Sequence, residues 1–195
     1  MQLIDILTLS LTLCFWVLFL TRTLMLARQG VKVFVMAKGK TWREKLVELA
    51  LMPLLTLWSV QILLTAIGRP PFGLPTLWAS TPLRWLGVAL CAVGLVIFVA
   101  ALVSFGSAWR VGIDEKGSNR LVTTGAFARS RNPIFVFMDI FFLGVFLVYP
   151  TLFFGIFFVC FASGIHTQIL NEERFLRGHF GDEYAAYCQK VRRYF

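Results

Sequence analysis

The sequence predicts an all-α integral membrane protein with about five transmembrane helices, the last two forming a tight hairpin. Hydrophobic residues make up 58% of the 195 residues, and charged residues only 15%. The apolar residues lie in long uncharged runs, and the basic residues are concentrated in alternate connections between these runs. This composition excludes a soluble globular domain.

Three runs, at residues 6–20, 49–67 and 85–105, carry no charge and approach the length of about 20 residues that a spanning helix needs. No basic segment precedes the first run and no small-residue cleavage site follows it, so we expect this helix to remain as an anchor. Thr81-Pro82 predicts the start of the third helix. Small residues share one face of this helix, where another helix can approach closely. They are Gly87, Cys91, Gly94 and Ala101.

Residues 134–165 form a longer apolar run in which only Asp139 is charged. Pro150, near its middle, ends a helix because it lacks a donor and restrains its neighbour. We therefore expect a helical hairpin with outer ends near Asn132 and Glu173, which brings both ends to one membrane face. Asp139 lies about 9 Å along the helix from Pro133, and we expect it to link helices in a structural role.

The basic residues predict the orientation. Seven Lys and Arg lie in 21–45, five in 107–131 and five in 171–195, but only two in 68–84. The N-terminus is therefore expected outside, with the first and third connections and the C-terminal tail in the cytoplasm. The basic stretch 32–45 is expected at the lipid interface. The net charge of +9 then reflects topology, with membrane lipids rather than nucleic acid as partners.

No repeat or linker divides the chain, so we expect one domain over 1–195, with three transmembrane helices in 1–106 and a catalytic region in 107–195. The spacing of the four cysteines suits no metal site, and no metal is expected.

Three stretches of the predicted catalytic region are candidates for chemistry, at residues 107–113, 121–135 and 168–195. Gly125 permits a positive φ and Pro133 suits a first helical turn, so residues 121–135 predict a loop entering a helix. The free N–H groups of such a helix start can bind an acceptor. Gln168 and Glu172 are four residues apart and share a helical face. Trp109-Arg110 is either a membrane-interface anchor or a ligand contact.

Several motifs occur in order: LVTxGxF from Leu121, RNPxF from Arg131, EExxL from Glu172, FGxxYxxY from Phe180 and VRR from Val191. Over residues 109–193 they resemble the C-terminal half of the isoprenylcysteine carboxyl methyltransferase family. Members more often carry His and Tyr where this chain has Asn132 and Phe135. The resemblance implies S-adenosylmethionine as cofactor, S-adenosylhomocysteine as product, and a lipophilic or prenylated acceptor that enters from the bilayer. It also implies that the C-terminal helices and tail hold the cofactor. Because the tail contains Phe180, Tyr184 and Tyr187, we expect it to fold over the cofactor and close the site.

From the resemblance and from these stretches we expect cofactor contacts at Leu121, Val122, Gly125, Phe127, Asn132, Pro133, Phe135, Glu172, Glu173 and Tyr184. In the family, an arginine that holds the substrate carboxylate is expected where this chain has Gln168. A neutral amide binds a carboxylate less strongly than a guanidinium does. Arg131, Arg192 and Arg193 are the candidates to replace that arginine.

Other functions stay open at this point. A phospholipid N-methyltransferase shares the same style of tail, and a membrane reductase with a nicotinamide cofactor is a weaker alternative. A lipid-binding membrane protein without turnover is the non-enzymatic alternative. The sequence contains no GxGxxG, so any nucleotide-like cofactor must be held by membrane helices and tail rather than by a Rossmann fold.

Overall fold

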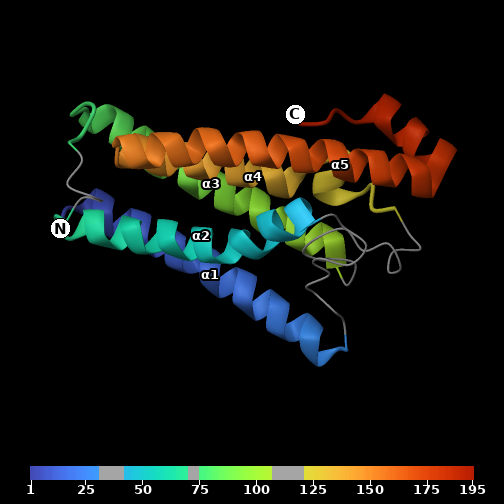
Figure 1. Ribbon diagram of the computed structural model, residues 1–195, viewed down its shortest axis with the longest axis horizontal. Coiled ribbons are helices and arrows are strands. Elements are labelled where there is room, and N and C mark those ends of the chain that lie inside the picture. The colour runs from blue at the N-terminus through green and yellow to red at the C-terminus, as the bar shows by residue number, and fades with distance from the viewer. Residues whose placement is uncertain (31–41, 70–74, 107–120) are drawn as a thin grey trace. The chain divides into compact units, whose positions relative to one another are not determined.

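The computed structural model describes residues 1–30, 42–69, 75–106 and 121–195 (Figure 1). The described helices are α1 (Leu3–Arg28), α2 (Trp42–Ala66), α3 (Thr81–Phe105), the short 3-10 helix η3 (Gly125–Ala128), α4 (Pro133–Val148) and α5 (Leu152–Lys190). The all-α prediction is confirmed for this part of the chain. Most of the basic interface stretch and the Trp109-Arg110 pair lie outside the described residues.

The helices have the lengths and apolar character of an integral membrane protein. α1, α3 and α5 are each long and apolar enough to cross a membrane, while Met52–Ala66 of α2 and the whole of α4 are shorter apolar helices. The described helices fall into two compact units. α1 and α2 belong to the first, and α3, η3, α4, α5 and the C-terminal segment belong to the second.

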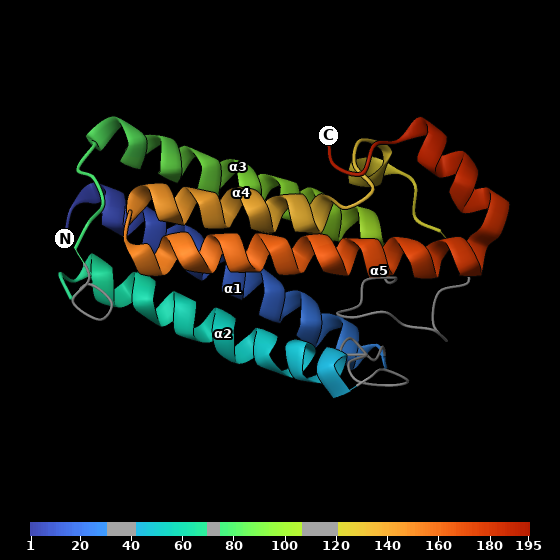
Figure 2. The same cartoon turned by 45° about the horizontal axis from the view of Figure 1, so that its top comes forward.

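In the first unit, α1 and α2 lie side by side (Figures 1 and 2). The Trp16 indole N–H donates to the Ser59 hydroxyl at 2.9 Å and so joins the two helices. Thr8 and Thr12 donate their hydroxyls to carbonyls one turn earlier, at 2.8 and 2.9 Å. These bonds satisfy polar groups that would be costly to leave unpaired in hydrocarbon.

In the second unit, the small-residue face of α3 packs against α4, as predicted. Gly87, Cys91, Gly94 and Ala101 are all buried. A Cβ placed on Gly144 of α4 would lie 2.6 Å from the Cys91 sulfur and 2.7 Å from the Gly87 carbonyl oxygen. The two backbones therefore approach so closely at this point that only glycine fits.

The predicted hairpin is also present. α4 ends at Val148 and α5 begins at Leu152, with Pro150 in the turn between them. The backbone N–H of Leu77 donates to the Pro150 carbonyl at 2.6 Å, and the Arg84 Nε donates to the Val148 carbonyl at 3.2 Å. The segment before α3 and the start of α3 thus satisfy carbonyls at the end of α4 and in the turn.

α5 is longer than the sequence analysis expected. Instead of ending near Glu173 it continues to Lys190, with one break at Gly181, whose φ of 48° and ψ of −121° interrupt the helical conformation. A positive φ is readily adopted by glycine. Beyond Gly181 the chain turns back, as the red end of the ribbon shows in Figure 2. The charged residues after Glu173 concealed an apolar stripe of helical spacing, which includes Leu176, Phe180, Tyr184 and Tyr187.

We expect Gly144→Val to destabilise the protein by about 1–3 kcal/mol, because the new side chain must displace the Cys91 sulfur or the α3 backbone. Gly164→Ala is the matched control, since a Cβ at Gly164 meets no atom within 4 Å. Thermal unfolding of both variants in one detergent measures the difference. Equal midpoints for Gly144→Val and the wild type would show that α3 and α4 do not need this close approach.

Candidate functional site

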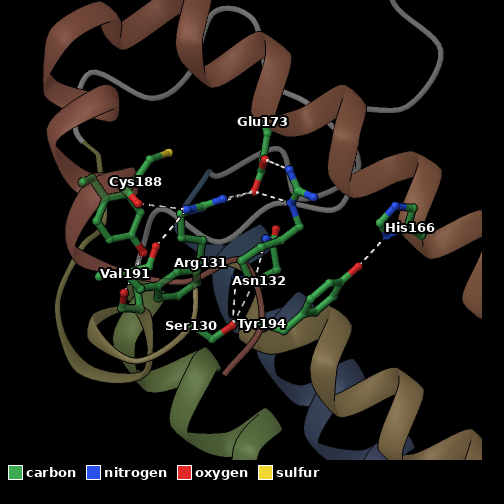
Figure 3. Close-up of polar contacts among 11 residues, drawn as sticks. Ser130, Arg131, Asn132, His166, Glu173, Cys188, Val191 and Tyr194 are labelled. Atoms are coloured by element: carbon green, nitrogen blue, oxygen red, sulfur yellow. Dashed lines mark hydrogen bonds and ion pairs between the residues drawn. The ribbon is translucent and has the colours of Figure 1, made fainter.

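A buried carboxylate lies where the loop before α4, the α5 segment around Glu173 and the C-terminal segment meet. Glu173 is only 4% exposed. Its Oε1 accepts hydrogen bonds from Arg131 Nη2 at 2.9 Å and from Arg131 Nε at 3.2 Å. The same carboxylate accepts from Arg193 Nε at 3.1 Å through Oε1 and from Arg193 Nη2 at 2.8 Å through Oε2. Figure 3 shows Glu173 between the two guanidinium groups.

Arg131 also binds the returning chain through backbone groups. Its Nη1 donates to the carbonyls of Val191 at 2.8 Å and Cys188 at 3.3 Å. Its own backbone N–H donates to the Arg192 carbonyl at 3.0 Å. One arginine thus joins the loop, α5 and the C-terminal segment.

The protonation of this group follows from its contacts. Burial alone would raise the pKa of Glu173, but the hydrogen bonds and charges of Arg193 and Arg131 outweigh burial and hold the pKa below its ordinary value. Burial alone would lower the pKa of Arg131, and the hydrogen bond and charge of Glu173 raise it above its ordinary value. At neutral pH the group holds two guanidinium ions and one carboxylate, and so carries one net positive charge.

The residues around Arg131 fasten the C-terminal segment to the start of α4. Ser130 donates its hydroxyl to the Arg193 carbonyl at 3.3 Å, and Asn132 donates its side-chain amide to the same carbonyl at 3.1 Å. Asn132 is the N-cap residue of α4, yet its side chain makes no capping bond to the helix. The N–H groups of the first turn after Pro133 are thus left uncapped by this side chain.

Apolar contacts also join the loop before α4 to the C-terminal end of the chain. Leu121, Tyr184, Tyr187 and Val191 form a buried cluster with Leu176, Phe180 and Cys188 packed against it. The Tyr187 hydroxyl donates to the Phe127 carbonyl at 2.6 Å. Burial raises the pKa of Tyr187 to about 12, so the hydroxyl keeps the proton that this bond needs.

The expected glycine turn before the cluster is present. Gly125 has a φ of 63°, and a Cβ there would collide with the Ser104 side chain of α3. The Ser104 hydroxyl accepts the backbone N–H of Ala126 at 2.9 Å. Glycine is therefore required both by the conformation and by the close approach to α3.

The structure brings most of the predicted site residues together. Direct polar contacts join Arg131, Asn132, Glu173, Arg193 and the backbone of Arg192. Leu121 and Tyr184 lie in the apolar cluster, with Phe127 and Gly125 beside it and Val122 next in sequence to Leu121. Pro133 and Phe135 lie in the first turn of α4. Gln168 and Glu172 are half-buried on α5, and the Arg192 side chain is exposed.

Two features of this region were not predicted from the sequence. The carbonyls of Cys188 and Val191 that bind Arg131 carry no signature in a sequence, because every residue has a carbonyl. The second feature is a hydrogen bond between the Tyr194 hydroxyl and Nδ1 of His166, which Figure 3 shows beside the ion pairs. An ionisable residue inside an apolar helix was the available signal for His166.

Long apolar helices, with polar residues gathered where a loop and a returning tail meet, define an all-α integral membrane protein. Residues 83–183, more than half of the chain, match phospholipid methyltransferases, and the chain belongs to that family. The match starts in α3 and ends just beyond Gly181 in α5. No curated protein matches the chain.

The family assignment agrees with the sequence resemblance at the level of the superfamily. Phospholipid methyltransferases and isoprenylcysteine carboxyl methyltransferases belong to one superfamily of membrane methyltransferases. The protein is thus a membrane methyltransferase by family.

We expect Glu173→Gln to release the C-terminal segment, because removing one partner of a buried ion pair costs about 3–5 kcal/mol. Trypsin should then cleave after the exposed Lys190 at least about a hundredfold and up to about a thousandfold faster, since cleavage follows the population of the open form. Glu183→Gln, an exposed carboxylate on the same C-terminal stretch, is the control and should cleave at the wild-type rate. Equal rates for both variants would show that Glu173 does not fasten the segment.

The ion pairs of Glu173 with Arg131 and Arg193 predict that the protein loses stability in acid. Because the pKa of Glu173 is lowered in the folded protein, its contribution is complete above the unfolded value of about 4.3 and is lost as the pH falls through the folded value. Below about pH 4, the thermal unfolding midpoint of the wild type should therefore fall more steeply with decreasing pH than that of Glu173→Gln. Parallel curves from pH 7 to pH 3 would contradict this assignment.

Proposed function

We propose that the protein transfers a methyl group from S-adenosylmethionine to the amine of a phospholipid headgroup. The observation that carries the proposal is that the family match covers α4 and most of α5, the helices that meet the C-terminal segment at the buried ion pairs. S-adenosylmethionine supplies an activated methyl group on a sulfonium ion, so the protein's main tasks are to position the two reactants and to exclude water.

The residues near the ion pairs have the donors and acceptors that this cofactor requires. Glu172 offers a carboxylate that can accept from ribose hydroxyls or from an amino group. The start of α4, with Asn132, Pro133 and Phe135, offers backbone N–H groups to a carboxylate, and backbone groups of Leu121 and Val122 suit an adenine ring. We assign Glu173 to closing the site, since both its oxygens already accept guanidinium donors.

The charges of the site favour an amine over a carboxylate as the methyl acceptor. Gln168 is neutral where the related family would hold a carboxylate with an arginine. Arg131 and Arg193 share Glu173 as a partner, which reduces their attraction for a second anion. Of the residues predicted to hold a substrate carboxylate, Arg192 keeps an exposed side chain.

Carboxyl methylation of a prenylated cysteine is the second candidate. It is favoured by the order of the motifs from Leu121 to Arg193 and by the one net positive charge of the ion-pair group. Both candidates have a water-soluble cofactor and a lipid acceptor. The returning chain carries Phe180, Tyr184 and Tyr187, and in either case it would cover the cofactor while the lipid enters between helices.

We expect Glu172→Gln to weaken S-adenosylmethionine binding by about 1.5–3 kcal/mol, the range for losing a hydrogen bond to a charged group. Calorimetric titration of the detergent-purified protein measures this affinity. Glu183→Gln serves again as the control. If the affinity of Glu172→Gln equalled that of the wild type, Glu172 would not contact the cofactor.

The acceptor is tested with methyl-labelled cofactor and two lipids. Vesicles containing phosphatidylethanolamine should become labelled in the headgroup, and N-acetyl-S-farnesylcysteine should not. Labelling of the farnesylated compound alone would replace the first candidate by the second. Cofactor binding without labelling of either lipid would favour a protein without turnover.

We further propose that the N-terminus lies outside the cell and that the cofactor site faces the cytoplasm. With the native cysteines replaced by alanine, Ala79→Cys in the exposed segment before α3 should react with an impermeant thiol reagent on intact cells. Ala186→Cys, exposed beyond Gly181, should react only after lysis. The reverse pattern would invert the orientation and separate the site from a cytoplasmic cofactor.

A further inference from the structure

Two ionisable residues, Asp139 and His166, lie at a similar depth along the apolar helices α4 and α5. Asp139 lies six residues after Pro133 in α4, and His166 lies seven residues before Glu173 in α5. At a rise of about 1.5 Å per residue these separations are about 9 and 10.5 Å along two antiparallel helices. Seven residues also return a helix to nearly the same face, so His166 lies on the Glu173 side of α5. Ionisable residues in apolar helices are costly and usually functional.

Tyr194 connects these residues to the ion-pair group. Its hydroxyl is hydrogen-bonded to Nδ1 of His166, and the two rings stack with an interplanar angle of 21° (Figure 3). Asp139 interacts electrostatically with both His166 and Tyr194. The preceding residue, Arg193, holds Glu173. Tyr194 thus links Arg193, its neighbour in the chain, to His166 through one hydrogen bond, and the charge of Asp139 acts on this polar path.

One carboxylate oxygen of Asp139 has no hydrogen-bond donor in the described part of the chain. This oxygen, Oδ1, is buried. The link between helices that the sequence predicts for Asp139 is therefore not found at this oxygen. A buried carboxylate oxygen is costly unless a donor or a positive charge lies beside it. A positive charge that forms near this oxygen is therefore stabilised.

We propose that Tyr194, His166 and Asp139 remove the proton from the acceptor amine, a role that rests on the methyl transfer proposed above. An alkylammonium ion has a pKa near 10 and no lone pair, so it must lose a proton before it can attack a methyl group. Tyr194 is the catalytic residue that touches the substrate. His166 and Asp139 act through it as positioning and charge-stabilising residues.

The step balances without another reactant. The ammonium N–H bond breaks and its proton passes to the Tyr194 oxygen, while the Tyr194 hydroxyl proton passes to Nδ1 of His166. The freed nitrogen lone pair forms the new N–CH₃ bond, and the S–CH₃ electron pair stays on sulfur. The resulting imidazolium lies beside the Asp139 carboxylate and later loses its proton to water.

The surroundings of Tyr194 keep its proton in place until it is needed. Burial and the carboxylates of Asp139 and Glu173 raise the pKa of the phenol, against an opposite effect of Arg193. The hydroxyl therefore stays protonated at neutral pH and can donate to His166. The charged and titratable groups that act on this path are Asp139 from α4, His166 and Glu173 from α5, and Arg193 from the C-terminal segment.

The activity test compares His166→Gln, Tyr194→Phe and Asp139→Asn with the control His179→Gln, which changes the other histidine of the chain. Cofactor affinity should stay within about twofold in all of them. Methyl transfer to phosphatidylethanolamine at pH 7 should fall about a hundredfold in the three variants but not in the control. Near pH 9.5 the deficit should shrink to about tenfold or less, because more acceptor is already deprotonated. A deficit that is equal at every pH, or wild-type turnover, would overturn the proposal.

A second measurement does not depend on the acceptor. With ¹⁵N-labelled histidine and the His179→Gln background, the spectrum reports His166 alone. Tyr194→Phe should shift the Nδ1 resonance of His166 in the absence of any lipid acceptor, because it removes the hydroxyl. An unchanged resonance would overturn the relay. A shifted resonance in a protein that methylates no amine would instead refute the proposed acceptor and leave the contact standing.

Discussion

The second compact unit depends on one carboxylate shared by two arginines. Glu173 is buried, and a single buried charge beside hydrocarbon would be costly. Arg131 approaches it from the loop before α4, and Arg193 approaches it from the C-terminal segment. Arg131 also binds carbonyls of the returning chain, and the Arg193 carbonyl accepts from Ser130 and Asn132. The ion pairs and these bonds together hold three separate parts of the chain in one place. The candidate cofactor and acceptor residues take their positions from this arrangement.

The apolar helices below the ion pairs determine where that carboxylate lies. Gly87 and Gly144 let α3 and α4 come into close backbone contact, and Pro150 reverses the chain so that α5 runs back along α4. The hairpin thereby returns Glu173 to the level of Arg131. Packing without water favours such close contacts between small residues, since the hydrophobic effect gives helices no preference for one another in lipid.

Much of this arrangement could be predicted from residue types with strong local rules. Few backbone conformations are allowed at Pro133 and Pro150, and the turn at Gly125 requires a positive φ. Close helix packing is favoured at the small-residue face of α3. Each of these features was found as predicted. The continuation of α5 beyond Glu173 was missed because charged residues there obscured an apolar stripe. The contact between Tyr194 and His166 was missed because it joins residues 28 apart through that break. Carbonyl partners of Arg131 leave no trace in a sequence. The roles of Gln168, Glu172 and Arg192 remain predictions, since they depend on ligands.

The reversal at Gly181 also affects the order in which the protein is completed. Arg131 and the Val191 carbonyl that it binds are 60 residues apart, and Arg193 follows later still. Glu173 and Arg131 both precede Arg193 in the chain, so the second ion pair forms only after the final residues have folded back. Closing of the site is therefore a late event in folding, and chains truncated before residue 193 keep this carboxylate with one of its two arginines. Such chains offer quality-control proteases an open segment that the finished protein conceals.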